Sequence, residues 1–161
     1  MVIPIEVTPI TEKEAANLKA RIIGDMPLFS YIPLKDTMDE ALNNWLKMLN
    51  AKLDYLINLL TCEKEGFTKL PLRKVNLSEK GLRFVAEKDF PIGSFVEIKM
   101  VLDLYQPLGF YLYGKVVRSE KKDDVYEVAL EFLPMSPDIR EKLSFYILQK
   151  EREIIRQMRG Y

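Results

Sequence analysis

Residues 94–104, SFVEIKMVLDL, alternate apolar and charged side chains over most of their length. The apolar members are Val96, Ile98, Met100, Leu102 and Leu104, and the charged ones are Glu97, Lys99 and Asp103. Successive side chains of a strand point to opposite faces, so this period of two predicts a strand with one face in a core.

The same pattern continues along the chain. Residues 108–118, LGFYLYGKVVR, and 125–132, VYEVALEF, also alternate, and polar or Pro/Gly connections such as KDFPIG and SEKKDD separate the strands. Five strands from residue 71 onwards predict a small antiparallel barrel in an α+β protein. Beyond them, Ser136 as N-cap and Pro137 at the first helical position predict a C-terminal helix to about Met158.

Upstream of the strands, residues 36–65 predict one long amphipathic helix. Its apolar residues recur at steps of 4-3-4-4-3-4, namely Met38, Leu42, Trp45, Leu49, Leu53, Leu56 and Leu60. This spacing keeps them on one face. The stripe is broader than one short neighbouring helix would cover, so we expect a homodimer or tetramer formed through residues 38–60. The alternative is that the helix packs on its own domain.

Three regions therefore follow one another: an N-terminal extension over 1–35, the long helix over 36–65, and a barrel with its C-terminal helix over 66–161. Within the extension, TEKEAANLKARII predicts a short helix with Thr11 as N-cap and Glu14 completing a capping box. The following GDMPLFSYIP, with its glycine and prolines, is expected to end that helix.

Composition excludes several functions. The chain has no histidine, one cysteine, and 24 basic against 24 acidic residues. Cys62 therefore has no histidine with which to form a catalytic pair, and neither a metal site nor a cofactor-binding loop is predicted. Zero net charge gives no general attraction to nucleic acid or membrane lipid. Without a signal peptide or an apolar run of about 18 residues, we expect a cytoplasmic, non-catalytic protein.

The stretch VNLSEKGLRF, residues 75–84, is polar for several residues and then becomes a strand. Asn76 and Ser78 can bond to their neighbouring backbone, and Gly81 permits a tight turn or a close approach. The same groups also offer an amide, a hydroxyl and bare backbone to a polar ligand.

With PIGSFVEIKMVL, YGKVVRSE and VALEF, this stretch resembles the PilZ family of bacterial cyclic-di-GMP effectors. Asn76, Ser78 and Gly81 match that family's [D/N]-x-S-x-x-G motif. The preceding LNAKLDYLINLL resembles the helix of the atypical, oligomer-forming PilZ subgroup. The resemblance implies a regulatory adaptor acting in motility, pili or biofilm formation through contacts with itself and with an unidentified signalling or motility protein.

The sequence departs from the family where the phosphates would be held. Family members have an R-x-x-x-R segment before the barrel, whereas residues 50–75 contain Arg73 as their only arginine, next to Lys74. Arg152 and Arg156 form the one literal R-x-x-x-R, on the C-terminal helix, and would reach the loop only from a neighbouring chain. We therefore expect cyclic-di-GMP to bind no tighter than roughly 100 μM.

Two alternatives stay open at this stage. The first is a cyclic-di-GMP receptor that binds the dinucleotide through the N-x-S-x-x-G loop. The second is a barrel for single-stranded nucleic acid, because Tyr111, Tyr113, Lys115 and Arg118 interleave aromatic and basic side chains along one strand.

Overall fold

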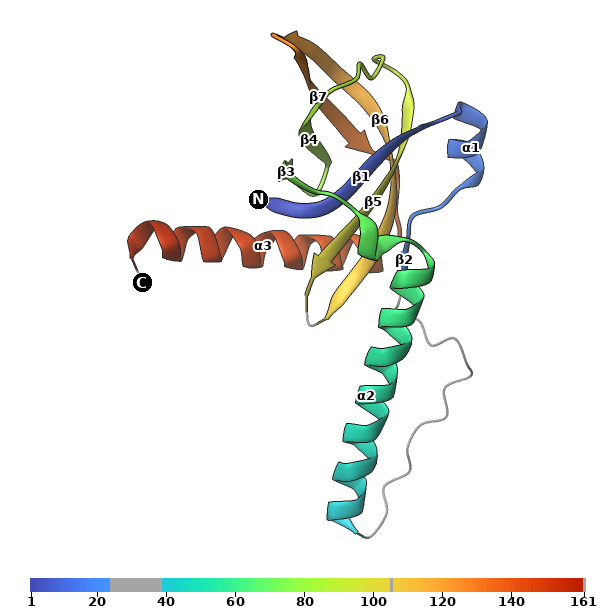
Figure 1. The fold of residues 1–161 in the computed structure, drawn as a ribbon, viewed down its shortest axis with the longest axis vertical. Coiled ribbons are helices and arrows are strands. Elements are labelled where there is room, and N and C mark those ends of the chain that lie inside the picture. The colour runs from blue at the N-terminus through green and yellow to red at the C-terminus, as the bar shows by residue number, and fades with distance from the viewer. Residues whose placement is uncertain (24–38, 105, 161) are drawn as a thin grey trace.

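The computed structural model describes residues 1–23, 39–104 and 106–160. Their elements follow in the order β1 (Val2–Ile10), α1 (Glu12–Asn17), β2 (Arg21–Ile23), α2 (Glu40–Lys64), the 3-10 turn η1 (Phe67–Lys69), β3 (Leu72–Leu77), β4 (Gly81–Ala86), β5 (Phe95–Asp103), β6 (Pro107–Lys122), β7 (Val125–Phe132) and α3 (Pro137–Arg159) (Figure 1). The predicted α+β fold, an antiparallel sheet with a long helix before it and a helix after it, is confirmed.

The strands pair with one another in a closed ring. Strand β7 pairs with both β4 and β6, so the neighbours run β6-β5-β1-β3-β4-β7 and back to β6, with β2 added on β6. Strand β6 is long enough for this because residues 107–115 pair with β5 and residues 114–122 pair with β7. A register shift between Val116 and Arg118 bends the strand where it changes partners.

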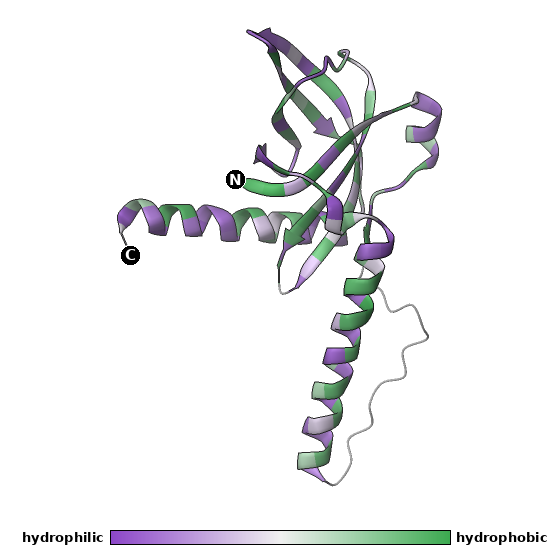
Figure 2. Cartoon of the chain, viewed as in Figure 1, coloured by the Kyte–Doolittle hydropathy of each residue, from purple (hydrophilic) through white to green (hydrophobic). Residues whose placement is uncertain are grey.

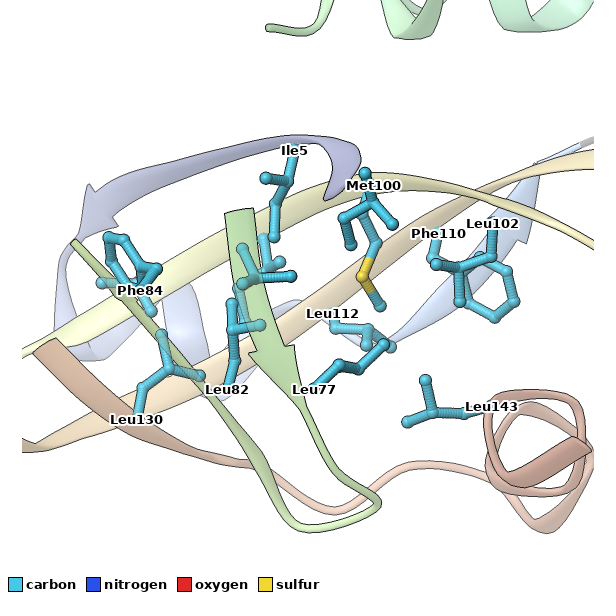
Figure 3. Packing of buried hydrophobic residues seen from close by; sticks show 14 of the residues in the cluster. Ile5, Leu77, Leu82, Phe84, Met100, Leu102, Phe110, Leu112, Leu130 and Leu143 are labelled. Carbon is cyan, nitrogen blue, oxygen red and sulfur yellow. The ribbon is translucent and has the colours of Figure 1, made fainter. Parts of the chain in front are cut away.

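The core lies inside this sheet and is closed by α3. The inward residues predicted for 94–104 and 108–118 are confirmed: Val96, Ile98, Met100, Leu102, Phe110 and Leu112 are all 0% exposed. From α3, Leu143 is also 0% exposed and belongs to the same cluster (Figure 3). The alternation therefore marks the inward face of these strands, although Tyr111 and Tyr113 on the outer face of β6 are also buried and Leu104 is only partly buried.

The N-terminal segment departs from the prediction. The Thr11 cap is present, with its hydroxyl accepting from the Glu14 N–H at 3.1 Å, but α1 ends at Asn17 and residues 21–23 form β2. Residues 2–10 form β1, which the sequence did not reveal because prolines interrupt it. Residues 2–4 pair only with β3 and residues 5–10 only with β5, so each proline has one unpaired side. The stretch GDMPLFSYIP lies outside the described residues.

One turn is also shorter than predicted. SEKKDD was expected to be a connection, yet β6 continues to Lys122 and β7 begins at Val125. Only Asp123 and Asp124 remain between the strands, and Asp123 has a φ of 56°. Aspartate tolerates this left-handed conformation, which tight two-residue hairpins require.

The two long helices leave the sheet in different directions (Figure 1). Helix α3 covers one end of the core with its first half, where Ile139, Leu143, Tyr146 and Ile147 are buried, and its second half extends beyond the sheet. Helix α2 contacts the sheet near its C-terminal end, where Asn58 and Cys62 are its buried residues. The rest of α2 projects away, with green apolar residues along its length (Figure 2).

Candidate functional site

The N-x-S-x-x-G stretch is the tight turn between β3 and β4. The Ser78 N–H donates to the Gly81 carbonyl oxygen at 2.9 Å. The Ser78 hydroxyl lies 3.2 Å from both that oxygen and the Gly81 nitrogen, so it donates to one and accepts from the other. The hydroxyl is thus engaged inside the turn. Asn76 lies on β3, exposed, opposite Arg83 of β4.

Gly81 is required by a close approach of two strands. A Cβ added to this residue would lie 2.1 Å from the Leu130 carbonyl oxygen of β7. No side chain larger than hydrogen fits there unless the strands move apart. The glycine of the motif therefore serves the pairing of β4 with β7, and its backbone is not left open for a ligand to approach from that side.

Basic side chains gather on the outer surface beside the turn. A cavity of about 640 Å³ is lined by four cationic and two acidic residues, namely Arg73, Lys74, Arg83 and Arg118 with Glu87 and Glu127. We call the four cationic residues the basic face. A second cavity of about 390 Å³ includes Asn76, Ser78 and Lys80 together with Arg83. The candidates Arg73, Lys74 and Asn76 therefore lie together, and the pairing of β3 with β4, of β4 with β7 and of β7 with β6 adds Arg83 and Arg118.

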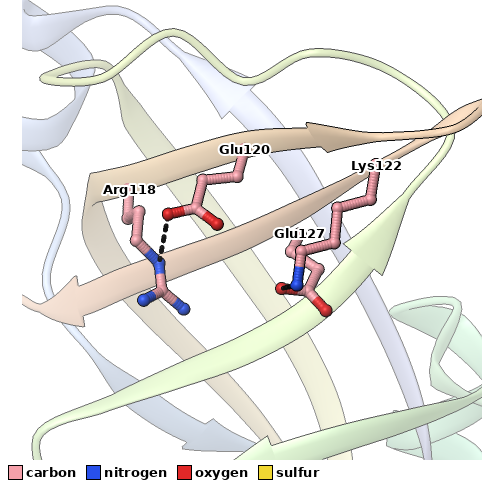
Figure 4. Close-up of polar contacts among 4 residues, drawn as sticks. All are labelled: Arg118, Glu120, Lys122 and Glu127. Carbon is pink, nitrogen blue, oxygen red and sulfur yellow. Dashed lines mark ion pairs between the residues drawn. The ribbon is translucent and has the colours of Figure 1, made fainter.

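Ion pairs at the edge of this cavity neutralise part of its charge. Lys122 Nζ lies 2.8 Å from Glu127 Oε2, and Arg118 Nε lies 4.0 Å from Glu120 Oε1 (Figure 4). Hydrogen bonding to Lys122 lowers the pKa of Glu127. Arg83 was not identified from the sequence, and Arg118 was named only for the nucleic-acid alternative, because their neighbours across the sheet depend on the register. The alternation in GLRF, which turns Arg83 outward, was the available signal.

The predicted pair Arg152 and Arg156 is not beside the turn of its own chain. A third cavity, of about 630 Å³, separates the turn from α3, and we call it the α3 groove. Its charged lining residues are Glu79, Glu141 and Glu151. Acidic side chains at this position disfavour a phosphate, and Arg152 and Arg156 lie further along α3, where both are exposed.

The predicted oligomerisation residues form an uncovered apolar surface on α2. The exposed fractions are 47% for Leu42, 67% for Trp45, 54% for Leu49, 50% for Leu53, 54% for Leu56 and 64% for Leu60. We call these six residues the α2 stripe. Met38, the first residue of the predicted spacing, lies outside the described part of the chain. Nothing in that part covers the stripe, so the described residues leave these side chains exposed.

A polar joint fixes the C-terminal end of α2 to the sheet. Tyr111 Oη donates to Glu65 Oε2 at 2.7 Å, and Lys99 Nζ donates to the Glu65 carbonyl oxygen at 2.6 Å. Asn58 is 1% exposed and donates through Nδ2 to the Pro107 carbonyl oxygen at 2.9 Å. After Glu65, Gly66 takes a φ of 82° and ends the helix in the left-handed region. These contacts define the direction in which α2 leaves the sheet.

The aromatic rings of this region are not open to nucleic-acid bases. Tyr111 and Tyr113 are only 6% and 3% exposed. The Arg21 guanidinium lies 3.8 Å above the Tyr111 ring, and Phe67 packs edge-on against it at 5.1 Å between centroids. Burial, followed by the hydrogen bond to Glu65, raises the pKa of Tyr111 to about 12. The stacking platform that Tyr111 and Tyr113 seemed to offer is therefore covered.

The lone thiol and the acidic groups offer no further site. Cys62 is 7% exposed, burial raises the pKa of its thiol, and its Sγ donates to Asn58 Oδ1 at 3.6 Å. Within residues 1–23, 39–104 and 106–160, no three His, Cys, Asp or Glu side chains form a group that could hold a metal ion. In the same residues, no helix is long and apolar enough to cross a membrane.

A similar fold occurs in a solved structure of a pathogenic protein from Xanthomonas campestris, described as a tetrameric PilZ domain self-assembled via an unusual helical bundle. The two share 16% identity with a TM-score of 0.65, over 98% of this chain and 86% of the other. No curated protein has a sequence that matches this chain.

The family model for the PilZ domain matches residues 58–149, which is more than half of the chain. The match begins in the last turns of α2, includes β3 to β7 and the turn with Asn76 and Ser78, and ends within α3. Members of this family are non-catalytic effectors in cyclic-di-GMP signalling. The chain belongs to the PilZ domain family.

Proposed function

We propose that this chain is a cytoplasmic PilZ adaptor whose output is contact with other proteins, first with copies of itself through α2, and whose own affinity for cyclic-di-GMP is weak. The observation that carries this proposal is the α2 stripe, six apolar side chains each at least 47% exposed. An unidentified signalling or motility protein is the expected downstream partner.

The α2 stripe supports self-association because exposing its large apolar side chains to water is unfavourable in the single chain. Each large apolar side chain that is taken out of water contributes about 1.5 to 3 kcal/mol when burial is complete. Six such residues on one helix face suit a helical bundle, in which identical stripes cover one another. The helical-bundle tetramer described for the Xanthomonas campestris protein is consistent with such a contact.

Weak ligand affinity is supported by how the turn uses its polar groups. The Ser78 hydroxyl already bonds inside the turn, and the α3 groove beside it is acidic. Neutral hydrogen bonds to a ligand replace bonds to water and contribute about 1 kcal/mol each, whereas phosphates require cations. With no R-x-x-x-R upstream of β3, we expect a Kd no tighter than roughly 100 μM.

A second candidate function is supported by the basic face. Arg73, Arg83 and Arg118 bring three guanidinium groups to a cavity of about 640 Å³. Guanidinium groups can hold phosphates with paired hydrogen bonds and can stack on bases. Under this alternative the chain is a cyclic-di-GMP receptor that holds the ligand with arginines from the sheet instead of an upstream arginine pair.

Assembly is tested by mass in solution. We expect the unmodified chain to be a dimer or larger at tens of micromolar, and Leu49→Glu with Leu56→Glu to reduce that mass, since charges would replace apolar contacts. Asn44→Glu with Ala51→Glu adds the same charge on the other side of α2, where both residues are exposed, and should leave the mass unchanged. An unmodified chain that is monomeric, or a mass unaffected by the leucine changes, would contradict self-association through α2.

Ligand binding is tested by calorimetry with cyclic-di-GMP. The adaptor proposal expects no saturable binding below roughly 100 μM. Binding tighter than about 10 μM that weakens in Arg83→Ala and Arg118→Ala would instead establish the receptor, with the basic face as its phosphate site. Comparable affinity that weakens in Ser78→Ala and is unchanged in Arg83→Ala and Arg118→Ala would assign the site to the turn.

A further inference from the structure

The side of α3 opposite to its core residues carries a stripe of its own. Its residues recur at steps of 4-3-4-3-4, close to one helical turn each. We call them the α3 stripe: Glu141, Phe145, Leu148, Arg152, Ile155 and Arg159. All six are exposed, and the apolar members are 52%, 47% and 48% exposed for Phe145, Leu148 and Ile155. The core uses other residues of this helix, such as Leu143 and Tyr146.

The α3 stripe is complementary to itself when it is read in reverse. Its spacing is symmetric about residue 150, so the first position corresponds to the last, the second to the fifth, and the third to the fourth. These pairs are Glu141 with Arg159, Phe145 with Ile155, and Leu148 with Arg152. Each pair joins acid to base, apolar to apolar, or apolar to a long aliphatic stem.

The α3 groove shares three residues with the α3 stripe and adds two further glutamates beside them. Glu79, Glu141 and Glu151 line it, together with the apolar Phe145 and Leu148. The end of α3 carries the opposite charge, from Arg152, Arg156 and Arg159, together with exposed Ile155. We call this C-terminal part of α3 the tail. The groove and the tail therefore match in charge and in apolar content. Within one chain the tail extends away from the groove, so the match is available to a second copy.

We propose that α3 pairs antiparallel with α3 of a second copy, about a two-fold axis near residue 150. Each tail then lies beside the α3 groove of the other chain, with Arg159 next to the second copy's Glu141. A two-fold contact is self-complementary, so every favourable pair occurs twice. This surface is separate from the α2 stripe, and it gives Arg152 and Arg156 a role in assembly.

The test uses the chain that already carries Leu49→Glu and Leu56→Glu, so that α2 contacts do not contribute. We expect this background to be a dimer at about 50 μM by sedimentation equilibrium. Phe145→Glu should weaken its dimerisation at least tenfold, since it places a carboxylate against Ile155 of the second copy. Ile154→Glu is the control, because Ile154 is 45% exposed on the same helix but lies outside the α3 stripe.

Charge exchange tests the antiparallel direction. Glu141→Arg and Arg159→Glu should each weaken dimerisation by about threefold to tenfold, and the double variant should restore it. Within one chain these positions are 18 residues apart, about 27 Å along the helix. Restoration therefore requires contact between two chains. A parallel pairing would bring identical residues together, and the double variant would then restore nothing.

In addition to a double charge-exchange variant that restores nothing, three results would overturn the proposal. They are a background that is monomeric at about 50 μM, a dimer that Phe145→Glu leaves intact, and a dimer that Ile154→Glu dissociates as fully as Phe145→Glu does. None of them bears on α2 self-association, which is measured in the chain with leucine at positions 49 and 56. The two contacts can therefore fail separately.

Discussion

The closed sheet and helix α2 are both rich in apolar residues, but the chain treats them in opposite ways. In β5 and β6, Met100, Leu102 and Leu112 are 0% exposed, whereas Leu49, Leu53 and Leu56 of α2 are each at least 50% exposed. The sheet achieves this by pairing its strands into a ring, so one face of every strand is enclosed. Helix α2 has only its C-terminal end against the sheet.

The difference shows where the stability of the fold resides and where its interactions lie. Apolar area that is buried within one chain stabilises that chain, while apolar area left in water becomes favourable only when another surface covers it. A change in the sheet should therefore alter the free energy of unfolding at any protein concentration. A change in α2 should alter assembly, and stability only through mass action.

The largest expected effect is the loss of stability when a buried leucine of the sheet is shortened. The same change on α2 serves as the comparison. Leu112→Ala removes a side chain that is 0% exposed and should lower the free energy of unfolding by about 2 to 5 kcal/mol, measured by urea denaturation. Leu53→Ala is the matched change on α2, 50% exposed, and should cost less than about 0.5 kcal/mol in a monomeric background. Equal losses in the two variants would refute the distinction between the regions.

The next effect concerns the closure of the sheet at Gly81. A methyl group on this residue would meet the Leu130 carbonyl oxygen at 2.1 Å, so Gly81→Ala must push β4 and β7 apart. We expect a loss of roughly 3 kcal/mol in the free energy of unfolding, since backbone cannot give way as a flexible side chain does. Hydrogen exchange should quicken in β4 and β7 while α2 keeps its wild-type rate. Wild-type stability in this variant would contradict the close approach.

How much of this comparison could be predicted depends on how local the signal is. The alternation in β5 predicted its buried residues, because burial follows directly from a period of two, whereas residues 108–114 of β6 are buried on both faces since Tyr111 and Tyr113 are covered on the outer side as well. The spacing of leucines predicted one continuous helix, because that spacing also depends only on residues close together in the sequence. By contrast, β1 is held by pairing with β3 and β5, and its prolines conceal the alternation of Ile3 and Ile5. Local propensity does not contain such long-range pairing.

In the candidate site too, the features made by neighbouring residues were predicted, and those made by residues distant in the sequence were not. The turn was recognised because Asn76, Ser78 and Gly81 are adjacent in sequence. The basic face was found only in part, since Arg118 comes from β6 and reaches the cavity beside Arg83 through the arrangement of the strands. The acidic lining of the α3 groove could not be foreseen either, because it requires knowing that α3 packs beside the β3–β4 turn.

A smaller effect is expected at the joint between the two regions. Folding raises the pKa of Tyr111 from 10.0 to about 12, through burial and then the hydrogen bond to Glu65, so the folded state favours the neutral phenol. The stability that this provides is complete below pH 10 and is lost as the pH rises towards about 12. Tyr111→Phe should cost about 1 kcal/mol at neutral pH.

The pH dependence separates this group from its neighbours. Burial also raises the pKa of Tyr113, so the unmodified chain should lose stability in alkali for more than one reason. In Tyr111→Phe, the decrease in the free energy of unfolding above pH 10 should be shallower than in the unmodified chain. Two parallel curves would show that Tyr111 ionises as freely in the folded protein as in the unfolded one.

The smallest effect on stability is expected from changes in the β3–β4 turn, which is the candidate ligand loop. Ser78→Ala removes a hydroxyl that bonds to both the nitrogen and the oxygen of Gly81, and should lower the free energy of unfolding by about 1 kcal/mol. Asn76→Ala changes an exposed side chain for which the described residues show no hydrogen bond, and should cost less. If the turn serves mainly the fold, stability should follow this order while calorimetry with cyclic-di-GMP remains unchanged. Should Asn76→Ala leave stability intact and abolish a measurable ligand affinity, the polar groups of the turn would belong to a binding site.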